Sequence, residues 1–171
     1  MVLRRKQFAH PDTEQKTVKV GTEGGEDVVI RPLRPMVIIE EMGRWQDAEQ
    51  IHNWFVRNVR GGNKEQGETI VSRAQLCKLL EESREVVKRS HLIPTKSFFG
   101  RKLGRGSSDD LSDGHVIVDT TYARKHFPVS GRLFGRKYDE QYLYDMHHTI
   151  NMLIEALDAS PDAYYSYQAS W

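Results

Sequence analysis

The residues best suited to chemistry in this sequence are one histidine and the aromatic side chains near it. His52 lies between Ile51 and Asn53, in a segment that also holds Trp45 and Trp54. An imidazole exchanges protons near neutral pH, so His52 suits either proton transfer or contact with a ligand. The alternative is structural, because a half-buried imidazole often bonds to a backbone group or a carboxylate. The sequence leaves both interpretations open.

Aromatic and basic residues also occur in two later segments, where they suit recognition of a phosphorylated ring. Aromatic rings stack on bases, and guanidinium groups bind phosphate with two parallel hydrogen bonds. The alternative is a structural role, in which the rings pack in the core and the basic residues lie on a solvated loop. The candidate ligand-binding residues are Trp45, His52, Trp54, Phe98, Phe99, Arg101, Lys137, Tyr138, Tyr142 and Asp145.

Other kinds of site find little support. His147 and His148 are adjacent, so on a helix they point about 100° apart and do not face one metal. The chain has no His-x-x-x-His spacing, and Cys77 is its single cysteine. The segment from Gly100 to Gly106 lacks the Lys-Ser or Lys-Thr ending of a P-loop. We therefore expect no metal, no cofactor and no recognisable catalytic set.

Composition narrows the class of protein. The 171 residues suit one domain, and the formal net charge of +1 makes nucleic acid an improbable partner. No apolar run suggests a signal peptide or a membrane span. With one cysteine, the sequence predicts a cytoplasmic protein without disulfides.

Periodicity predicts three amphipathic helices, at 44–59, 72–90 and 139–157. Ser72 and Gln75 form a capping-box pattern at the start of the second helix, and Asp139 is the expected N-cap of the third. Such helices bury their apolar stripes only by packing together. The predicted fold class is α+β, with the three helices packed against a small, mainly antiparallel sheet.

The predicted strands are short and separated by turns. Residues 17–20 and 27–30 suggest a hairpin, and strands are expected at 36–39 and 115–120. Residues 94–100 are predicted as a loop. The polar residues 1–16 are expected to form a flexible arm before a single domain at 17–160. Residues 161–171 are a tail that either docks or stays loose.

One segment is similar to a known signature. Residues 43–56 read Gly-Arg-Trp-Gln-Asp-Ala-Glu-Gln-Ile-His-Asn-Trp-Phe-Val. They resemble the Gly-Tyr-Trp-Arg-Lys-Ala-Asn-x-Ile-His-x-Trp-Phe-Val signature of a family of small, mostly uncharacterised bacteriophage proteins. The similarity continues, in order, through 71–76, 92–95, 98–100 and 138–142. Arg44, Gln46, Asp47 and Glu49 depart from the signature, so a ligand bound by those positions would differ. Residues 101–135 look like an insertion relative to that family.

The resemblance implies a phage origin and action in the cytoplasm of an infected bacterial host, but no reaction. Small phage proteins often counter host defence, and three hypotheses follow. The first is a non-enzymatic binder that sequesters a small anionic, nucleotide-type ligand. The second is an interaction module that inhibits a host protein. The third is an enzyme on a phosphorylated substrate, with His52 as acid or base. Homo-oligomerisation is also expected, because the aromatic content exceeds what a three-helix core needs.

Overall fold

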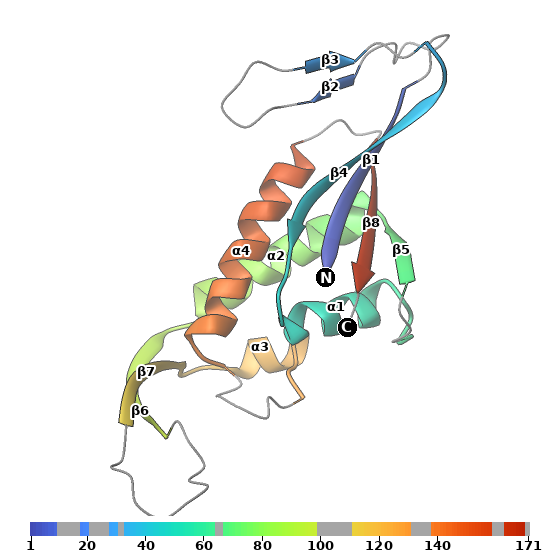
Figure 1. The fold of residues 1–171 in the computed structure, drawn as a ribbon. Coiled ribbons are helices and arrows are strands. Elements are labelled where there is room, and N and C mark those ends of the chain that lie inside the picture. The colour runs from blue at the N-terminus through green and yellow to red at the C-terminus, as the bar shows by residue number, and fades with distance from the viewer. Residues whose placement is uncertain are drawn as a thin grey trace, which may run out of the picture.

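The computed structural model describes residues 1–9, 18–20, 28–30, 33–63, 67–98, 111–130, 138–158 and 163–169. Its centre is a four-stranded sheet with helices on one side (Figure 1). The strands are β1 (Val2–Ala9), β4 (Met36–Arg44), β5 (Gly67–Val71) and β8 (Tyr164–Ala169). Their order is β4-β1-β8-β5, and every neighbouring pair is antiparallel.

Both central strands come from segments that the sequence analysis set apart from the domain. The prediction of a flexible arm is wrong for residues 2–9, because β1 pairs with β4 on one side and β8 on the other. Residues 164–169 of the expected tail form β8. Between Val2 and Phe8, where burial is described, only Leu3 of β1 is fully buried, and Arg5 of the same strand pairs with Glu40 at 2.5 Å. Because its sequence is so polar, β1 was not predicted to be a strand at the centre of the sheet.

Four helices occur among the described residues, one more than predicted. The predicted three correspond to α1 (Glu49–Asn58), α2 (Arg73–Arg89) and α4 (Glu140–Leu157). The additional helix is α3 (Thr121–His126), within the predicted insertion 101–135, for which no helix was predicted. The α+β class is confirmed, with a mainly antiparallel sheet, but the helix count of three is wrong.

The ends of the helices follow local chemistry. The Ser72 hydroxyl accepts a hydrogen bond from the Gln75 amide at 3.2 Å, and the Ser72 amide donates to the Gln75 side chain at 2.8 Å. The predicted capping box is therefore confirmed. Asp139 caps α4 by accepting from the Tyr142 amide at 3.0 Å. After α1, Gly61 and Gly62 adopt φ values of 60° and 93°, which favour glycine and turn the chain.

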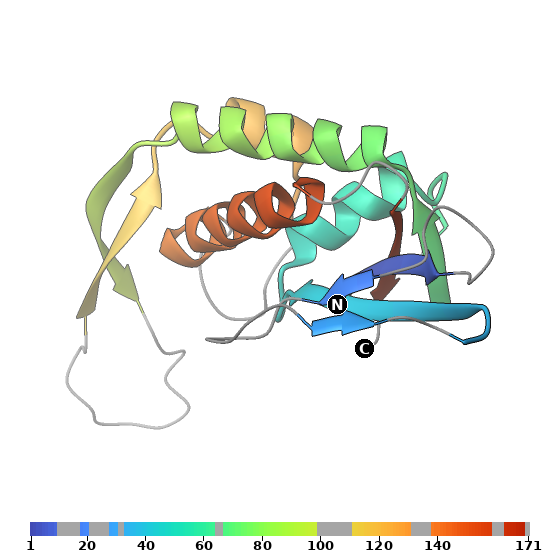
Figure 2. The ribbon, with the colours of Figure 1, turned by 90° about the horizontal axis from the view of Figure 1, so that it is seen from above.

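Two hairpins extend from this body. The predicted hairpin is confirmed as β2 (Val18–Val20) paired with β3 (Val28–Ile30). A second ribbon, β6 (Leu92–Phe98) with β7 (Leu111–Ile117), projects away from the helices in Figures 1 and 2. The prediction of a loop at 94–100 is therefore wrong for residues 94–98.

Pro94 lies inside β6, opposite His115 of β7, although proline lacks the N–H that a strand ladder uses. A two-stranded ribbon tolerates proline where the missing donor would face an open edge. The predicted insertion, 101–135, contains β7 and α3. Its residues 101–110 and 131–135 lie outside the described part of the chain.

The core lies between the helices and the sheet (Figure 2). Phe55 of α1 stacks on Tyr167 of β8, with ring centroids 3.9 Å apart and planes 8° from parallel. The Tyr165 hydroxyl donates to the Ala156 carbonyl of α4 at 2.6 Å. Other fully buried side chains are Leu3, Ile51, Leu76, Leu79, Met146 and Leu153. These contacts join both ends of the sequence to all three long helices.

Candidate functional site

The tryptophans predicted to contact a ligand lie inside the core. Trp45 is buried, packs edge-on against Phe55, and donates from its indole nitrogen to the Thr149 hydroxyl at 2.8 Å. Trp54, a neighbour of the core residue Phe55 in the sequence, is also fully buried. Helix α1 is covered by the sheet on one side and by α2 on another, so its buried surface is wider than one stripe.

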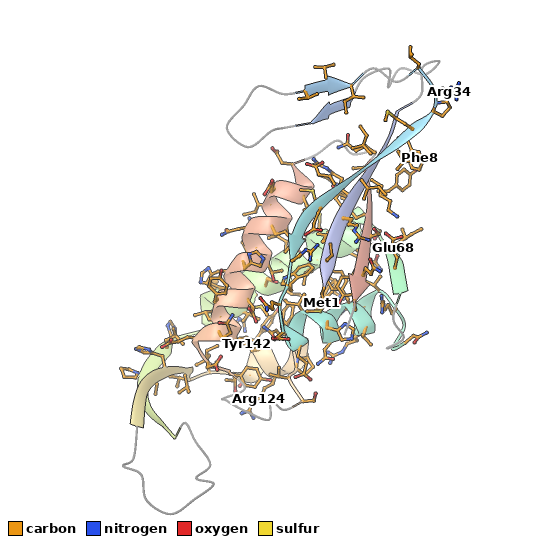
Figure 3. All side chains as sticks on the ribbon, in the orientation of Figure 1. Met1, Phe8, Arg34, Glu68, Arg124 and Tyr142 are labelled. Carbon is orange, nitrogen blue, oxygen red and sulfur yellow. The ribbon has the colours of Figure 1, made fainter. Side chains whose placement is uncertain are left out.

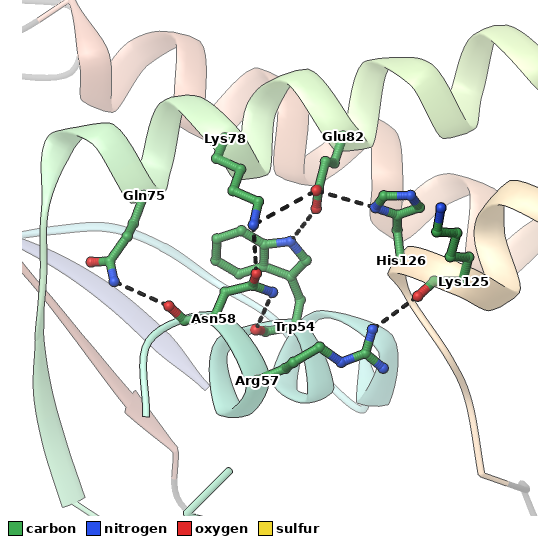
Figure 4. A network of polar contacts seen from close by, with 8 residues as sticks. All are labelled: Trp54, Arg57, Asn58, Gln75, Lys78, Glu82, Lys125 and His126. Atoms are coloured by element: carbon green, nitrogen blue, oxygen red, sulfur yellow. Dashed lines mark hydrogen bonds and ion pairs between the residues drawn. The ribbon is translucent and has the colours of Figure 1, made fainter. Parts of the chain in front are cut away.

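The Trp54 indole belongs to a polar network that joins three helices (Figure 4). Its nitrogen donates to Glu82 of α2 at 2.6 Å. The other Glu82 oxygen lies 3.1 Å from Nδ1 of His126 at the end of α3. Lys78 donates to the Asn58 side-chain carbonyl at 2.8 Å, and its ammonium nitrogen lies 4.0 Å from Glu82. The network therefore accounts for the Trp54 indole by contacts within the chain.

His52 is also held inside the protein. It is buried, and its Nδ1 lies 2.8 Å from the hydroxyl of Tyr167. Tyr167 in turn lies beneath the Arg60 guanidinium, 5.3 Å from the ring centroid. Burial raises the pKa of the Tyr167 phenol well above its usual range. The geometry gives His52 a partner in the sheet and favours the structural interpretation.

Tyr142 and Asp145 of α4 are likewise buried. Figure 3 shows Tyr142 close to α3. The Tyr142 hydroxyl donates to the Phe127 carbonyl at 3.3 Å, and burial raises the pKa of this phenol strongly. Asp145 accepts hydrogen bonds from the side-chain amide of Gln50 at 2.6 Å and from the side-chain amide of Gln141 at 3.0 Å. These side chains tie α4 to α1 and to the loop after α3.

The remaining predicted site residues are only partly described. Tyr138 is buried, and its ring lies 5.0 Å from that of Tyr142. Phe98 ends β6, but its side chain lies outside the described part of the structure. Phe99, Arg101 and Lys137 are also outside the described residues. The predicted residues that are described gather in the core, and none of them lines the cavity described next.

That cavity has a volume of about 670 Å³ and is open to solvent, with the buried residues Val56 and Val129 in its lining. Its walls come from α1, the glycine turn after it, and the loop after α3. The lining residues are Asn53, Val56, Arg57, Gly61, Gly62, Pro128, Val129 and Ser130. Sequence reasoning missed this set because it followed the apolar stripe of α1, whereas Asn53 and Arg57 follow a polar stripe with the same spacing.

The second candidate surface is the open face of the sheet, which we define as the side turned away from the helices. Tyr165, Tyr167 and Ala169 of β8 are buried against the helices. Because strand side chains alternate, Tyr164, Ser166 and Gln168 point the other way, together with their cross-strand partners. Figure 2 shows the four helices on one side of this sheet.

The open face combines exposed apolar residues with charges that are already paired. Its large apolar side chains are Phe8 (53% exposed), Val37 (45%), Ile39 (58%), Ile70 (77%) and Tyr164 (57%). Beside them, Lys6 lies 2.8 Å from Glu68, which also accepts from the Ser166 hydroxyl at 2.7 Å. The hydrogen bond from Lys6 holds the pKa of the Glu68 carboxyl below its usual value.

Two further observations concern metals and membranes. Among the described residues, no group of three or more histidine, cysteine or acidic side chains is arranged to hold a metal ion. Within those same ranges, each helix is too short or too polar to cross a lipid bilayer.

Comparison of the chain with protein-family models, with curated proteins and with solved structures gave no match in any of the three. Its function is therefore argued from its own residues.

Proposed function

We propose that this chain is a protein-interaction module whose open face binds an apolar, weakly charged surface of a partner protein. The observation that carries the proposal is the one-sided sheet, in which helices cover one face while Phe8, Val37, Ile39, Ile70 and Tyr164 are exposed on the other. An antiparallel sheet with one face in water normally carries polar side chains there. Adjacent exposed apolar groups are typical of an interaction surface.

The arrangement of these side chains supports a continuous contact patch. Phe8 lies directly opposite Val37 in the β1–β4 pair, and its ring packs edge-on against Tyr164 at 5.5 Å. Ile39 and Tyr164 flank Lys6 on its two neighbouring strands. Aromatic anchors within an apolar patch make the largest contributions to protein–protein affinity.

The charges of the open face favour a partner with little net charge. Lys6 is paired with Glu68, and Glu41 with Arg44 at 2.5 Å. Arg4 donates to Gln168 at 2.7 Å. Because these groups already satisfy one another, a strongly charged partner would gain little from them, and burying them against an apolar surface leaves few unpaired charges.

The other two hypotheses have less support. A small-ligand site built from the tryptophans, His52 and Tyr142 would require core side chains to open toward solvent. An enzyme based on His52 would require that imidazole to leave the Tyr167 hydroxyl. The resemblance to phage proteins suggests that the partner belongs to a bacterial host, and inhibition of that partner is the simplest outcome of binding.

The proposal is tested by capture of bacterial proteins with three forms of the full chain. The open-face variant carries Ile39→Glu and Ile70→Ser, and the matched control carries Ile154→Lys on the exposed side of α4. We expect wild type and control to retain the same polypeptide and the open-face variant to lose it. Light scattering measures the oligomeric state of all three forms. If the open-face variant captures the same polypeptide as wild type, a partner protein does not bind this face. If wild type is a homodimer and the open-face substitutions dissociate it, the face binds a second copy of the chain, which also contradicts the proposal.

A further inference from the structure

The cavity beside α1 carries a separate inference, independent of the open face. Its volume of about 670 Å³ falls within the range of roughly 300–1,000 Å³ common for small-molecule sites. Val56, Pro128 and Val129 supply apolar walls, while Asn53, Arg57 and Ser130 supply polar groups. A few polar groups among apolar walls are typical of a site that orients a small ligand.

Arg57 is the charged residue among the described lining residues, and one hydrogen bond of its side chain is to the backbone of α3. Its Nη1 donates to the Lys125 carbonyl at 2.8 Å (Figure 4). A guanidinium has five N–H donors, so most of the Arg57 donors remain for a ligand. The planar fork of arginine matches the oxygens of a carboxylate or phosphate.

The polar groups around the cavity are held by the chain itself. The Asn53 amide donates to the Pro128 carbonyl at 2.9 Å, which fixes the loop against α1. Glu49 is the acid beside this loop, and it accepts from the Ser130 amide at 3.0 Å and from the Ser130 hydroxyl. These hydrogen bonds hold the Glu49 carboxylate against Ser130, and among the described lining residues Arg57 is the one that carries a charge.

The glycine turn leaves the cavity unobstructed. A Cβ atom built on Gly61 or Gly62 would meet no atom within 4 Å, so any side chain there would project into open space. The φ value of 93° at Gly62 disfavours residues with a side chain. Bare backbone therefore forms this wall of the cavity.

We propose that the cavity binds a small organic anion. Its acidic group would pair with the Arg57 guanidinium, and its apolar part would pack on Val56, Pro128 and Val129. Phosphate and carboxylate share the oxygen geometry that arginine recognises, so the chemical class is an aromatic or aliphatic monophosphate or carboxylate.

The test titrates isotope-labelled full-length protein with phenyl phosphate, benzoate and benzyl alcohol, followed by amide chemical shifts. These probes share a ring and differ in the acidic group. We expect saturable shifts at Asn53, Arg57 and Gly62 with at least one anion. With benzyl alcohol we expect no saturable shifts that indicate a comparable affinity. Phenyl phosphate binding more tightly than benzoate would assign a phosphate, and the reverse order a carboxylate.

Substitution of Arg57 gives the second arm. Arg57→Gln is expected to weaken the preferred anion about tenfold, the usual loss for a charged hydrogen bond. Arg57→Lys should retain part of the affinity, and Arg84→Gln, an exposed arginine on α2, should leave it unchanged. Three results would each overturn the proposal. The first is that benzyl alcohol binds as tightly as the anions, and the second is that neither anion gives a saturable shift. The third is that Arg57→Gln, in folded protein, leaves the affinity for the anion unchanged.

Discussion

The two faces of the central sheet carry similar side chains and have opposite environments. Tyr164 and Tyr165 are neighbours in β8, yet Tyr164 is exposed and Tyr165 is buried. The covered face packs Tyr165 and Tyr167 against α4 and α1, and both hydroxyls find partners there. The open face places Tyr164 beside Phe8 in solvent. Residue type alone therefore does not indicate which aromatic group supports the fold and which is free to bind.

The same contrast holds across α1. Trp54 and His52 point into the core, whereas Asn53 and Arg57 line a cavity open to solvent. Trp45 and Trp54, which suggested a site in the sequence, are buried in the core. The surfaces open for binding instead hold Phe8 and Tyr164 on the sheet and Asn53 and Arg57 beside α1, and the sequence patterns did not single these residues out.

The largest expected effect is loss of a core ring. Trp54→Ala should lower the free energy of unfolding by about 3–5 kcal/mol, because it creates a cavity and removes the indole donor to Glu82. Tyr164→Ala on the open face should cost less than about 1 kcal/mol, since it loses mainly the edge contact with Phe8. Urea denaturation of both variants measures the difference. Similar losses for the two would indicate that the open face is covered in solution.

Alkaline pH should destabilise the covered face. Burial raises the pKa of Tyr142 and Tyr167 above the ordinary value of 10.0. Below pH 10 both folded and unfolded chains keep these protons. Above pH 10 the unfolded chain releases them and the folded chain does not. The free energy of unfolding should then fall by about 1.4 kcal/mol per pH unit for each phenol. A matched Tyr142→Phe variant should show a smaller slope in the same titration, and an unchanged slope would contradict burial as the cause.

A smaller effect distinguishes the two kinds of tyrosine hydroxyl. Tyr167→Phe keeps the ring stacked on Phe55 but removes the hydroxyl that lies 2.8 Å from His52 Nδ1, which should cost about 1–2 kcal/mol in chemical denaturation. Tyr164→Phe should change stability by less than about 0.5 kcal/mol. If both substitutions were neutral, the contact between His52 and Tyr167 would contribute no net stability.

The smallest expected effect on stability belongs to the open-face substitutions. Ile39→Glu and Ile70→Ser should each change the free energy of unfolding by less than about 0.5 kcal/mol, because both side chains are more than half exposed. Ile39→Glu also places a carboxylate opposite Lys6 in the neighbouring strand. Thermal and urea unfolding test this expectation. A loss above 1 kcal/mol would show that these residues serve the fold of the single chain.

Much of the helical framework was predictable, because its signals are local. The Ser72–Gln75 capping box and the Asp139 cap lie within four residues of the groups that they bond. The short helix α3 was missed because its residues carry a strongly basic pattern without an apolar stripe. Its position depends on distant contacts, among them His126 with Glu82.

The candidate sites were less predictable, because they depend on strand pairing. Strand β1 has a polar sequence, and its charges are accommodated by Glu40 of β4 and Glu68 of β5. Neither partner is near in the chain. The sequence does not show that His52 contacts Tyr167, which lies 115 residues away in the chain. The aromatic residues around His52 therefore suggested a ligand site.

The sequence by itself determined where α2 and α4 begin and end, because hydrogen bonds within a helix and its caps join residues a few positions apart. The start predicted for the first helix, at residue 44, is wrong, because Arg44 ends β4 and α1 begins at Glu49. The sequence also determined the α+β class, through the alternation of apolar patterns with periods near 3.6 and 2. Only the tertiary structure decided which face of the sheet the helices cover, and hence which aromatic residues are buried. Burial depends on contacts between segments far apart in the chain. Here the first strand, β1, and the last strand, β8, pair with each other at the centre of the sheet.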